Sequence, residues 1–225
     1  MNNKKNETKQ RKKPWPTRDA MEQIYEMNLW GSNGSDFYSG DGSHDRAIID
    51  PYIRCLVSFL TSFKTPISVC DLGCGDFNVG KQLVKYTKEY VAVDIVPNLI
   101  AYNKKVFSDK NLEFRCLDIV TDSLPDGDCV IIRQVFQHLS NNEVKCILDK
   151  LIKYKYIIVT EHIPNGSFEP NKDIISGQGI RLKKQSGLHL LSSPFNFKVK
   201  EEKKLHSFLL NDNKEVIETI LYSVF

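Results

Sequence analysis

Three acidic side chains follow short apolar segments in the first half of the chain. They are Asp71, Asp94 and Asp118, and two glycines, Gly73 and Gly75, come directly after the first acid. Asp94 lies 21 residues after Gly73. A glycine turn lets a backbone approach a charged ligand closely, and a carboxylate about 20 residues further on can bind ribose hydroxyls. The spacing therefore predicts a cleft for a charged ligand that contains a ribose.

Apolar segments alternate with amphipathic ones around these acids, which indicates an α/β protein with a parallel sheet. The carboxyl ends of parallel strands share one edge, where ligands of open α/β sheets bind. We expect strands at 67–70, 90–94, 112–117, 128–133, 155–160, 195–204 and 215–225. We expect helices at 17–30, 45–62, 79–86, 97–107 and 140–152, the last with a capping box of Ser140 and Glu143.

The glycine turn does not match a dinucleotide fingerprint. The pattern G-x-G-x-x-G would require glycine at position 78, and the residue there is Asn78. This substitution disfavours an NAD(P)-dependent oxidoreductase.

The motifs around the three acids resemble those of class I S-adenosylmethionine-dependent methyltransferases. The matching residues are Asp71-Leu72-Gly73-Cys74-Gly75, Asp94-Ile95 and Asp118-Ile119, with further similarity at 128–140 and 156–162. The resemblance covers residues 45–163 well and the C-terminal part loosely, and it departs at Phe77, where the family often has a third glycine. It implies a Rossmann-like methyltransferase fold, with a mostly parallel seven-stranded sheet, helices on both faces and a C-terminal antiparallel hairpin.

The resemblance implies S-adenosylmethionine as the cofactor, with S-adenosylhomocysteine as its product. Asp71 would lie near the methionine ammonium, Asp94 would accept both ribose hydroxyls, and Asp118 would meet the adenine amino group. The cofactor-binding residues would be Asp71, Gly73, Cys74, Gly75, Asn78, Asp94, Ile95, Asp118, Ile119 and Arg133. Each acid alone has a simpler interpretation as a helix cap or turn residue.

Candidate acid–base residues follow the fourth and fifth strands. We expect Glu161 to act with His162 or His138, because a histidine titrates near neutral pH and a carboxylate can fix its tautomer. A structural role for His138 beneath the cofactor is the alternative. Adjacent strand residues point to opposite faces, which argues against both Glu161 and His162 reaching the cleft.

Two segments rich in glycine flank the predicted sheet core. Residues 31–43 are a candidate lid, with Trp30, Ser39 and Gly40 as its contact residues, although a simple connector is the alternative. Residues 163–193 form a long loop expected to shape the substrate pocket. Its Arg181 and the more distant Gln134 are candidate substrate contacts, and a solvated basic loop is the alternative for Arg181.

No metal site is expected, because the chain lacks H-E-x-x-H and Cys/His ligand patterns. Some members of the family place a catalytic metal on an Asp after the fourth strand and on an Asp-Asn pair after the fifth. This chain has Arg133 and Glu161-His162 there.

The net charge of +3 is unevenly distributed. Residues 1–20 hold seven basic and two acidic residues, so the remainder is near −2 and shows no basic character typical of nucleic-acid binding. The six cysteines form no C-x-x-C pair, and we expect them to be reduced, which suits the cytoplasm. No apolar run reaches the ~18 residues typical of a membrane span, so we expect no membrane partner.

We therefore expect a disordered basic tail at 1–16, N-terminal helices and a lid at 17–63, and a cofactor-binding domain at 64–225. The predicted function is methylation of a small-molecule acceptor on oxygen or nitrogen. One alternative is an RNA or protein methyltransferase that uses the Lys-rich tail. Another is a cofactor-binding module without catalysis.

Overall fold

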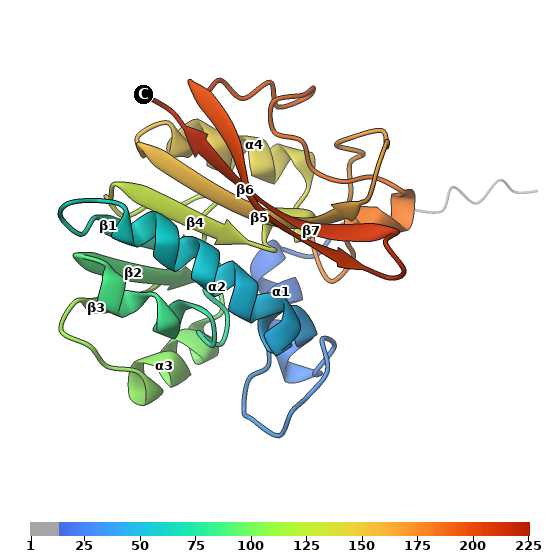
Figure 1. The fold of residues 1–225 in the computed structure, drawn as a ribbon. Helices are drawn as coiled ribbons and strands as arrows, with labels where there is room; N and C mark the ends of the chain where they lie inside the picture. The colour runs from blue at the N-terminus through green and yellow to red at the C-terminus, as the bar shows by residue number, and fades with distance from the viewer. Residues whose placement is uncertain (1–13) are drawn as a thin grey trace, which may run out of the picture.

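A seven-stranded sheet with the order β3-β2-β1-β4-β5-β7-β6 forms the centre of the molecule (Figure 1). The computed structural model describes residues 14–225, so the predicted tail lies largely outside the described residues. The strands are β1 (Ser68–Leu72), β2 (Glu89–Asp94), β3 (Leu112–Cys116), β4 (Cys129–Arg133), β5 (Tyr156–Pro164), β6 (Glu201–Leu210) and β7 (Glu215–Ser223). The first five pair in parallel, whereas β7 runs antiparallel between β5 and β6. The predicted fold class is confirmed.

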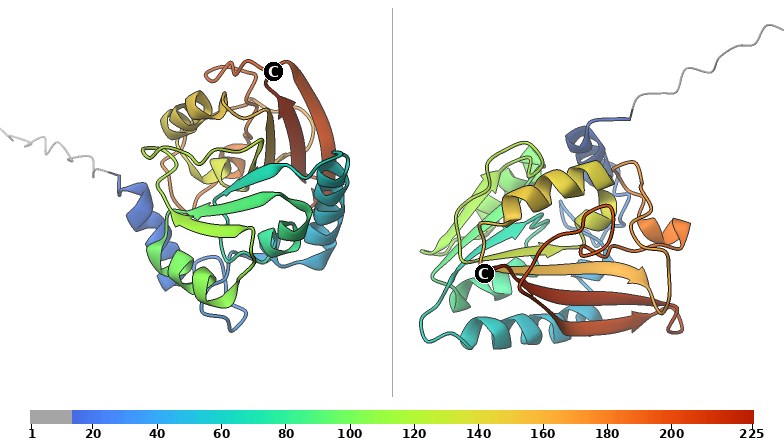
Figure 2. Two further views of the ribbon diagram at one scale, coloured as in Figure 1. Left: turned by 90° about the vertical axis from the view of Figure 1, so that its left-hand side faces the viewer. Right: turned by 90° about the horizontal axis from the view of Figure 1, so that it is seen from above.

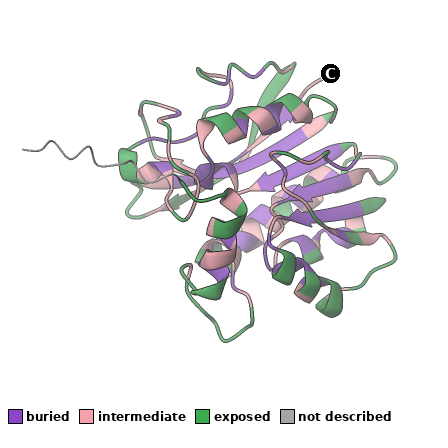
Figure 3. Cartoon of the chain, turned by 180° about the vertical axis from the view of Figure 1, so that it is seen from behind, coloured by how far each residue is buried: buried purple, intermediate pink, exposed green. Residues whose placement is uncertain are grey.

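Helices cover both faces of this sheet (Figures 1 and 2). The α-helices are α1 (Thr17–Glu26), α2 (Arg46–Thr61), α3 (Pro97–Val106) and α4 (Asn141–Leu151). Apolar side chains of α2 and α3 pack on one face, and those of α4 pack on the other. The strands between these layers are mostly buried, while the outer helix faces are exposed (Figure 3). At α4, the predicted capping box of Ser140 and Glu143 is present.

The predicted helix at 79–86 is wrong. Two 3₁₀ turns replace it, at Gly80–Gln82 and Val84–Tyr86. Phe77, where the family often has glycine, has a φ of 62° and packs its buried ring edge-on against neighbouring aromatic rings. A Cβ at Gly80 would lie 2.4 Å from the Phe77 ring, so this packing requires glycine, which is a poor helix former.

The predicted strand at 195–204 also begins in the wrong place, since β6 starts at Glu201. Asn196 has a φ of 47°, which an extended strand does not allow. Phe195 and Phe197 instead pack into the core on the α4 face, within the long segment between β5 and β6. The apolar alternation that predicted a strand therefore reflects anchoring of a loop.

Four features of this architecture position the site. The glycine turn follows β1, Asp94 ends β2, Arg133 ends β4, and the segment before α2 folds back over these strand ends. Among the helices of residues 14–225, none is long and apolar enough to cross a membrane.

Candidate active site

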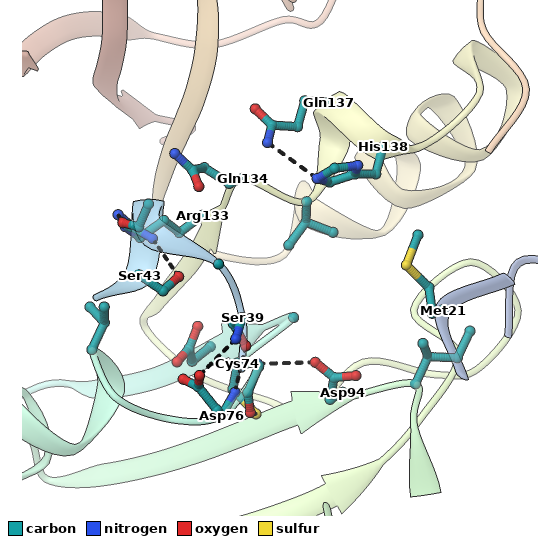
Figure 4. Close-up of a pocket in the computed structure, with 18 of the residues that line it drawn as sticks. Met21, Ser39, Ser43, Cys74, Asp76, Asp94, Arg133, Gln134, Gln137 and His138 are labelled. Carbon is teal, nitrogen blue, oxygen red and sulfur yellow. Dashed lines mark hydrogen bonds between the residues drawn. The ribbon is translucent and has the colours of Figure 1, made fainter. Parts of the chain in front are cut away.

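A cavity of about 430 Å³ lies at the carboxyl ends of β1, β2 and β4 (Figure 4). The sequence-predicted residues that line it are Asp71, Gly73, Cys74, Gly75, Asp94, Ile95, Asp118, Ile119, Arg133, Trp30, Ser39, Gly40, Gln134 and His138. Asn78, Glu161, His162 and Arg181 were also predicted, but they do not line it. Most of the predicted cofactor residues are thus brought together, whereas two of the three predicted catalytic residues are not.

Glycine is required at both positions of the turn that follows β1. Gly73 has a φ of 82°, and a Cβ there would lie 2.3 Å from Cγ2 of Val135. Gly75 has a φ of 56°, and a Cβ there would lie 2.5 Å from the Ser39 hydroxyl. Left-handed backbone and lack of space both exclude a side chain, so the backbone itself forms this wall of the cavity.

Asp94 fixes the glycine turn from the end of β2. Its Oδ2 accepts the backbone N–H of Gly75 at 3.0 Å, and its Oδ1 accepts that of Val96 at 3.1 Å. Burial raises the pKa of the Asp94 carboxyl, and the backbone N–H groups oppose that shift. On the other side, Asn103 Nδ2 donates to the Gly75 carbonyl at 2.8 Å. The turn is therefore held from both directions.

Asp71 lies within β1 and lines the same cavity. The Tyr90 hydroxyl donates to its Oδ2 at 2.8 Å. Burial raises the pKa of Asp71 to about 6, even though the Tyr90 hydrogen bond favours the charged form. This carboxylate is consequently suited to a cationic group of a ligand, and its charge depends on the pH just below neutrality.

The predicted lid folds against the glycine turn. Asp76 Oδ2 accepts the backbone N–H of Ser39 at 2.8 Å and contacts Nε2 of His44 at 2.6 Å. In return, the Asp76 backbone N–H donates to the Ser39 hydroxyl at 2.9 Å. Asn78 also holds this segment, because its Nδ2 donates to the Ser43 carbonyl at 2.7 Å. Asn78 therefore supports the lid from outside the cavity.

Arg133 links the end of β4 to the same lid segment. Its Nη1 donates to the Ser43 hydroxyl at 3.2 Å and its Nη2 donates to the Gly42 carbonyl, while its guanidinium lies 5.0 Å from the centre of the Tyr52 ring. Its Nε is buried and has no hydrogen-bond partner among residues 14–225. An unpartnered cationic N–H beside the cavity is suited to an anionic group such as a carboxylate.

His138 lies across the cavity from Asp94 (Figure 4). Its ring centre is 5.3 Å from that of Trp30, so the two rings form adjacent parts of the wall. Burial lowers the pKa of His138 to about 4.

Glu161 and His162 do not form the predicted acid–base pair in this cavity. Glu161 accepts the backbone N–H groups of Phe136 and Gln137 at 3.0 and 2.9 Å, and it lines a second cavity of about 290 Å³. The His162 imidazole pairs with Glu215 at 2.9 Å. As neighbours on β5, the two side chains project to opposite faces of the sheet, and neither reaches the edge where the main cavity lies.

Arg181 is a structural residue and not an exposed substrate contact. Only 1% of its surface is accessible. Its guanidinium donates to the carbonyls of Phe136 and Leu139 at 2.9 and 2.8 Å, and to Asn141 Oδ1 at 2.7 Å. It therefore holds the loop 163–193 against the segment that carries His138, while Lys183 from the same loop lines the cavity.

Asp118 is a turn residue that also lines the cavity. Its Oδ1 accepts the backbone N–H of Val120 at 2.9 Å, as a turn residue does, and its side chain still lines the cavity beside Ile119. Within residues 14–225, no group of three or more His, Cys, Asp or Glu residues could hold a metal ion.

Sequence reasoning missed three residues of the site. Asp76 binds the lid, Tyr90 bonds to Asp71, and Asn103 supports the glycine turn. Only Asn103 carried a usable signal, because it lies one helical turn after the apolar Leu99 and Ile100 of α3 and is fully buried. A polar residue on a buried helix face must find a hydrogen-bond partner.

The amino-acid sequence of this region is similar to those of known proteins. Residues 69–154 match the family model described as a methyltransferase domain. The malonyl-[acyl-carrier protein] O-methyltransferase of Acetivibrio thermocellus is 32% identical over 93 residues, which cover 40% of this chain and 32% of the relative. Residues 69–154 are thus a methyltransferase domain, which agrees with the resemblance to class I S-adenosylmethionine-dependent methyltransferases. The match to this curated relative spans about a third of the relative's length.

Solved methyltransferase structures share the fold across most of the chain. The N-methyltransferase NodS of Bradyrhizobium japonicum, in complex with S-adenosylhomocysteine, superposes with a TM-score of 0.62 at 12% identity, covering 91% of this chain and 99% of that chain. Magnesium protoporphyrin IX methyltransferase from Synechocystis, also with S-adenosylhomocysteine, gives 0.57 at 13% identity, covering 92% and 100%. The overall fold of this chain is thus shared with these methyltransferase structures.

Proposed function

We propose that this methyltransferase uses S-adenosylmethionine to methylate a small-molecule acceptor on oxygen or nitrogen. The observation that carries the proposal is the turn of Gly73 and Gly75, fixed by Asp94 at the edge of a 430 Å³ cavity. The turn leaves room for backbone contact with a ligand, and the carboxylate faces the same space. Two relatives of the same fold were solved with S-adenosylhomocysteine bound.

The charged groups of the cavity match the charged groups of this cofactor. Asp71 offers a carboxylate to the methionine ammonium, and the unpartnered Nε of Arg133 offers a donor to the methionine carboxylate. Asp94 serves the ribose hydroxyls, although its oxygens also accept two backbone N–H groups. Ile95 and Ile119 supply apolar surface for the adenine, with Asp118 at its amino group.

When bound, the cofactor supplies an electrophilic methyl group on its sulfonium. The residues of this chain bind the two reactants, align the acceptor with the methyl group and exclude water. Positioning and desolvation provide much of the rate in such a transfer. The lid contacts of Asp76 with Ser39 and His44 support this role, because they close one side of the cavity.

A small acceptor is favoured by the size and enclosure of the site. The lid, the wall formed by Trp30 and His138, and the loop containing Lys183 all contribute residues to the cavity lining. The six cysteines are free thiols, which suits a reducing compartment such as the cytoplasm. The Lys-rich tail of the alternative proposal, an RNA or protein methyltransferase, lies largely outside the described residues.

Transfer of a labelled methyl group tests this function. The purified chain is incubated with methyl-labelled S-adenosylmethionine and a library of small hydroxyl, carboxyl and amine compounds. We expect label in at least one small product and formation of S-adenosylhomocysteine. Label that appears only on RNA or protein, and is lost when residues 1–13 are deleted, would replace the small-molecule proposal with the alternative.

A further inference from the structure

The orientation of the Gln137 amide is determined by its backbone neighbour. The N–H of His162 lies 3.0 Å from Gln137 Oε1. A backbone N–H can only donate, so the atom that faces it must be the amide oxygen. The other end of the Gln137 side chain is therefore the NH₂ group, which can only donate.

This NH₂ group determines the proton on one nitrogen of His138. Gln137 Nε2 lies 3.2 Å from His138 Nε2 (Figure 4). Because the amide donates, His138 Nε2 must accept with its lone pair and carries no proton. The other ring nitrogen, Nδ1, lies 3.1 Å from the carbonyl oxygen of Gly177, which can only accept. Nδ1 therefore carries the proton, and the two contacts independently specify the same neutral tautomer.

The groups around His138 also favour the neutral form of its imidazole. Arg181, from the loop 163–193, carries a fixed positive charge that disfavours an imidazolium, and burial lowers the pKa of His138 to about 4. Glu161, from β5, is directed to the Phe136 and Gln137 backbone and makes no hydrogen bond to the imidazole. The Trp30 ring covers another side. No carboxylate of residues 14–225 is hydrogen-bonded to either ring nitrogen.

We infer that His138 is locked as a neutral imidazole with both nitrogens engaged inside the protein, so that it shapes the acceptor wall and takes no proton. The inference deepens the proposed function, on which it rests. A proton on Nε2 would face the NH₂ of Gln137, and rotation of that amide would place NH₂ against the His162 N–H. The acceptor must therefore reach the cavity already deprotonated, as a carboxylate, a phenolate or an uncharged amine.

The carboxylates that line the cavity do not supply an obvious replacement for His138 as a base. Asp71 accepts the Tyr90 hydroxyl and Asp94 accepts the Gly75 N–H. Asp76 bonds to the lid, and Asp118 bonds to the backbone of Val120. Asp41, on the lid, accepts the hydroxyl of Tyr38. An acceptor that brings its own lone pair requires only alignment with the methyl group, with Arg133 and Lys183 as the cations that line the cavity.

Nitrogen NMR of the histidine rings tests the protonation state of His138 without any methyl transfer. Full-length protein labelled with ¹⁵N-histidine is examined from pH 5 to 8, and a His138→Phe variant assigns the signals of this ring. We expect Nδ1 protonated, Nε2 unprotonated and no titration midpoint of His138 within this range. A proton on Nε2, or a midpoint between pH 5 and 8, would overturn the inference.

A matched pair of variants shows whether Gln137 keeps His138 in its neutral form. Gln137→Glu keeps an oxygen for the His162 N–H and presents a second one to His138 Nε2, so it should raise the titration midpoint of His138 by about one to three pH units. Gln134→Glu adds the same charge to the same cavity without a bond to His138, and it should shift the midpoint much less. Equal shifts in both variants would show that general charge, and not the Gln137 contact, controls the ring.

The choice of methyl acceptor tests whether the acceptor must already be deprotonated when it enters the cavity. With labelled S-adenosylmethionine at pH 7.5, benzoate and 4-nitrophenol are compared with benzyl alcohol and phenol, which stay protonated. We expect transfer to favour the ionised compounds by at least about a hundredfold. Preferred transfer to the alcohol that is abolished in His138→Phe would overturn the inference. Failure to bind S-adenosylmethionine would overturn the proposed function and leave the NMR result on His138 unaffected.

Discussion

Asp94 Oδ2 accepts a hydrogen bond from the backbone N–H of Gly75 at 3.0 Å. This contact joins the end of β2 to the glycine turn that follows β1. A carboxylate expected to bind the ribose thus also fixes the turn expected to hold the methionine part of the cofactor. The two halves of the proposed site are consequently coupled through one side chain.

Cofactor affinity should decrease at acidic pH because of Asp71. Burial places its pKa at about 6 in the free protein, so the carboxylate that would attract the methionine ammonium is lost as the pH falls through 6. Binding to the charged form then weakens by up to about tenfold per pH unit below this value. Calorimetric titrations from pH 5 to 8 measure the effect.

The Tyr90→Phe variant provides a matched test of this pH dependence. It removes the hydrogen bond that favours the charged Asp71, so the pH at which affinity declines should move upward. Asp71→Asn should bind weakly at every pH and lose the dependence. An affinity for wild type that is constant across this range would contradict the role of Asp71.

The Asp76→Asn variant should release the cofactor faster than wild type. It removes the carboxylate that accepts the Ser39 N–H and contacts His44, and hydrogen bonds to charged groups contribute about 1.5–3 kcal/mol. We expect the dissociation rate to rise on the order of tenfold in stopped-flow measurements. Asp36→Asn, an exposed change in the same segment, is the control, and equal rates for both variants would exclude a lid held by Asp76.

Arg181 should contribute to the stability of the fold and not to the recognition of an anionic acceptor. Arg181→Met leaves the carbonyls of Phe136 and Leu139 without their donor, and we expect a loss of roughly 3 kcal/mol in the free energy of unfolding. For a chain of this size, that corresponds to a fall in Tm of roughly 6–12 °C. Lys183→Met is the control, and its Tm should stay close to that of wild type. An unchanged Tm for Arg181→Met would contradict the structural role assigned to these hydrogen bonds.

Gly73→Ala should destabilise the fold through two separable effects. Its left-handed backbone costs alanine about 1–2 kcal/mol, and contact of the new methyl with Val135 adds about 1–3 kcal/mol. Gly34→Ala isolates the backbone effect, because Gly34 has a φ of 87° and open space around it. In urea unfolding, a second change, Val135→Ala, should relieve only the contact. Equal losses for Gly73→Ala and Gly34→Ala would exclude the contact with Val135.

The meeting of the glycine turn with Asp94, on the proposed cofactor side, could be predicted from the sequence because its geometry is local. Gly73, Gly75 and Asp94 lie at the ends of adjacent strands, so their spacing along the chain determines that they meet. The packing of Phe77 against Gly80 is also local, but it replaced the expected helix with 3₁₀ turns. Aromatic packing there overrides the apolar periodicity that predicted the helix.

The acceptor side could not be predicted, because it depends on contacts between distant segments. Glu161 is directed to the backbone of Phe136 and Gln137, and His162 to Glu215, according to which face of β5 each occupies. Arg181 is buried because a long loop folds back onto the carbonyls of Phe136 and Leu139. The residue types predicted catalytic or substrate-binding roles at these positions. In the structure, contacts with distant segments direct these side chains away from the main cavity.

Calorimetric titration with S-adenosylmethionine tests the central claim most directly. Wild type, Asp94→Asn and the control Asp109→Asn, which changes an exposed residue, are compared at pH 7.5, with thermal unfolding to show that each is folded. We predict binding by wild type and the control, and affinity at least about tenfold weaker for Asp94→Asn. A folded wild-type protein that does not bind, or an Asp94→Asn variant that binds equally well, would contradict the assignment of this cavity as the cofactor site.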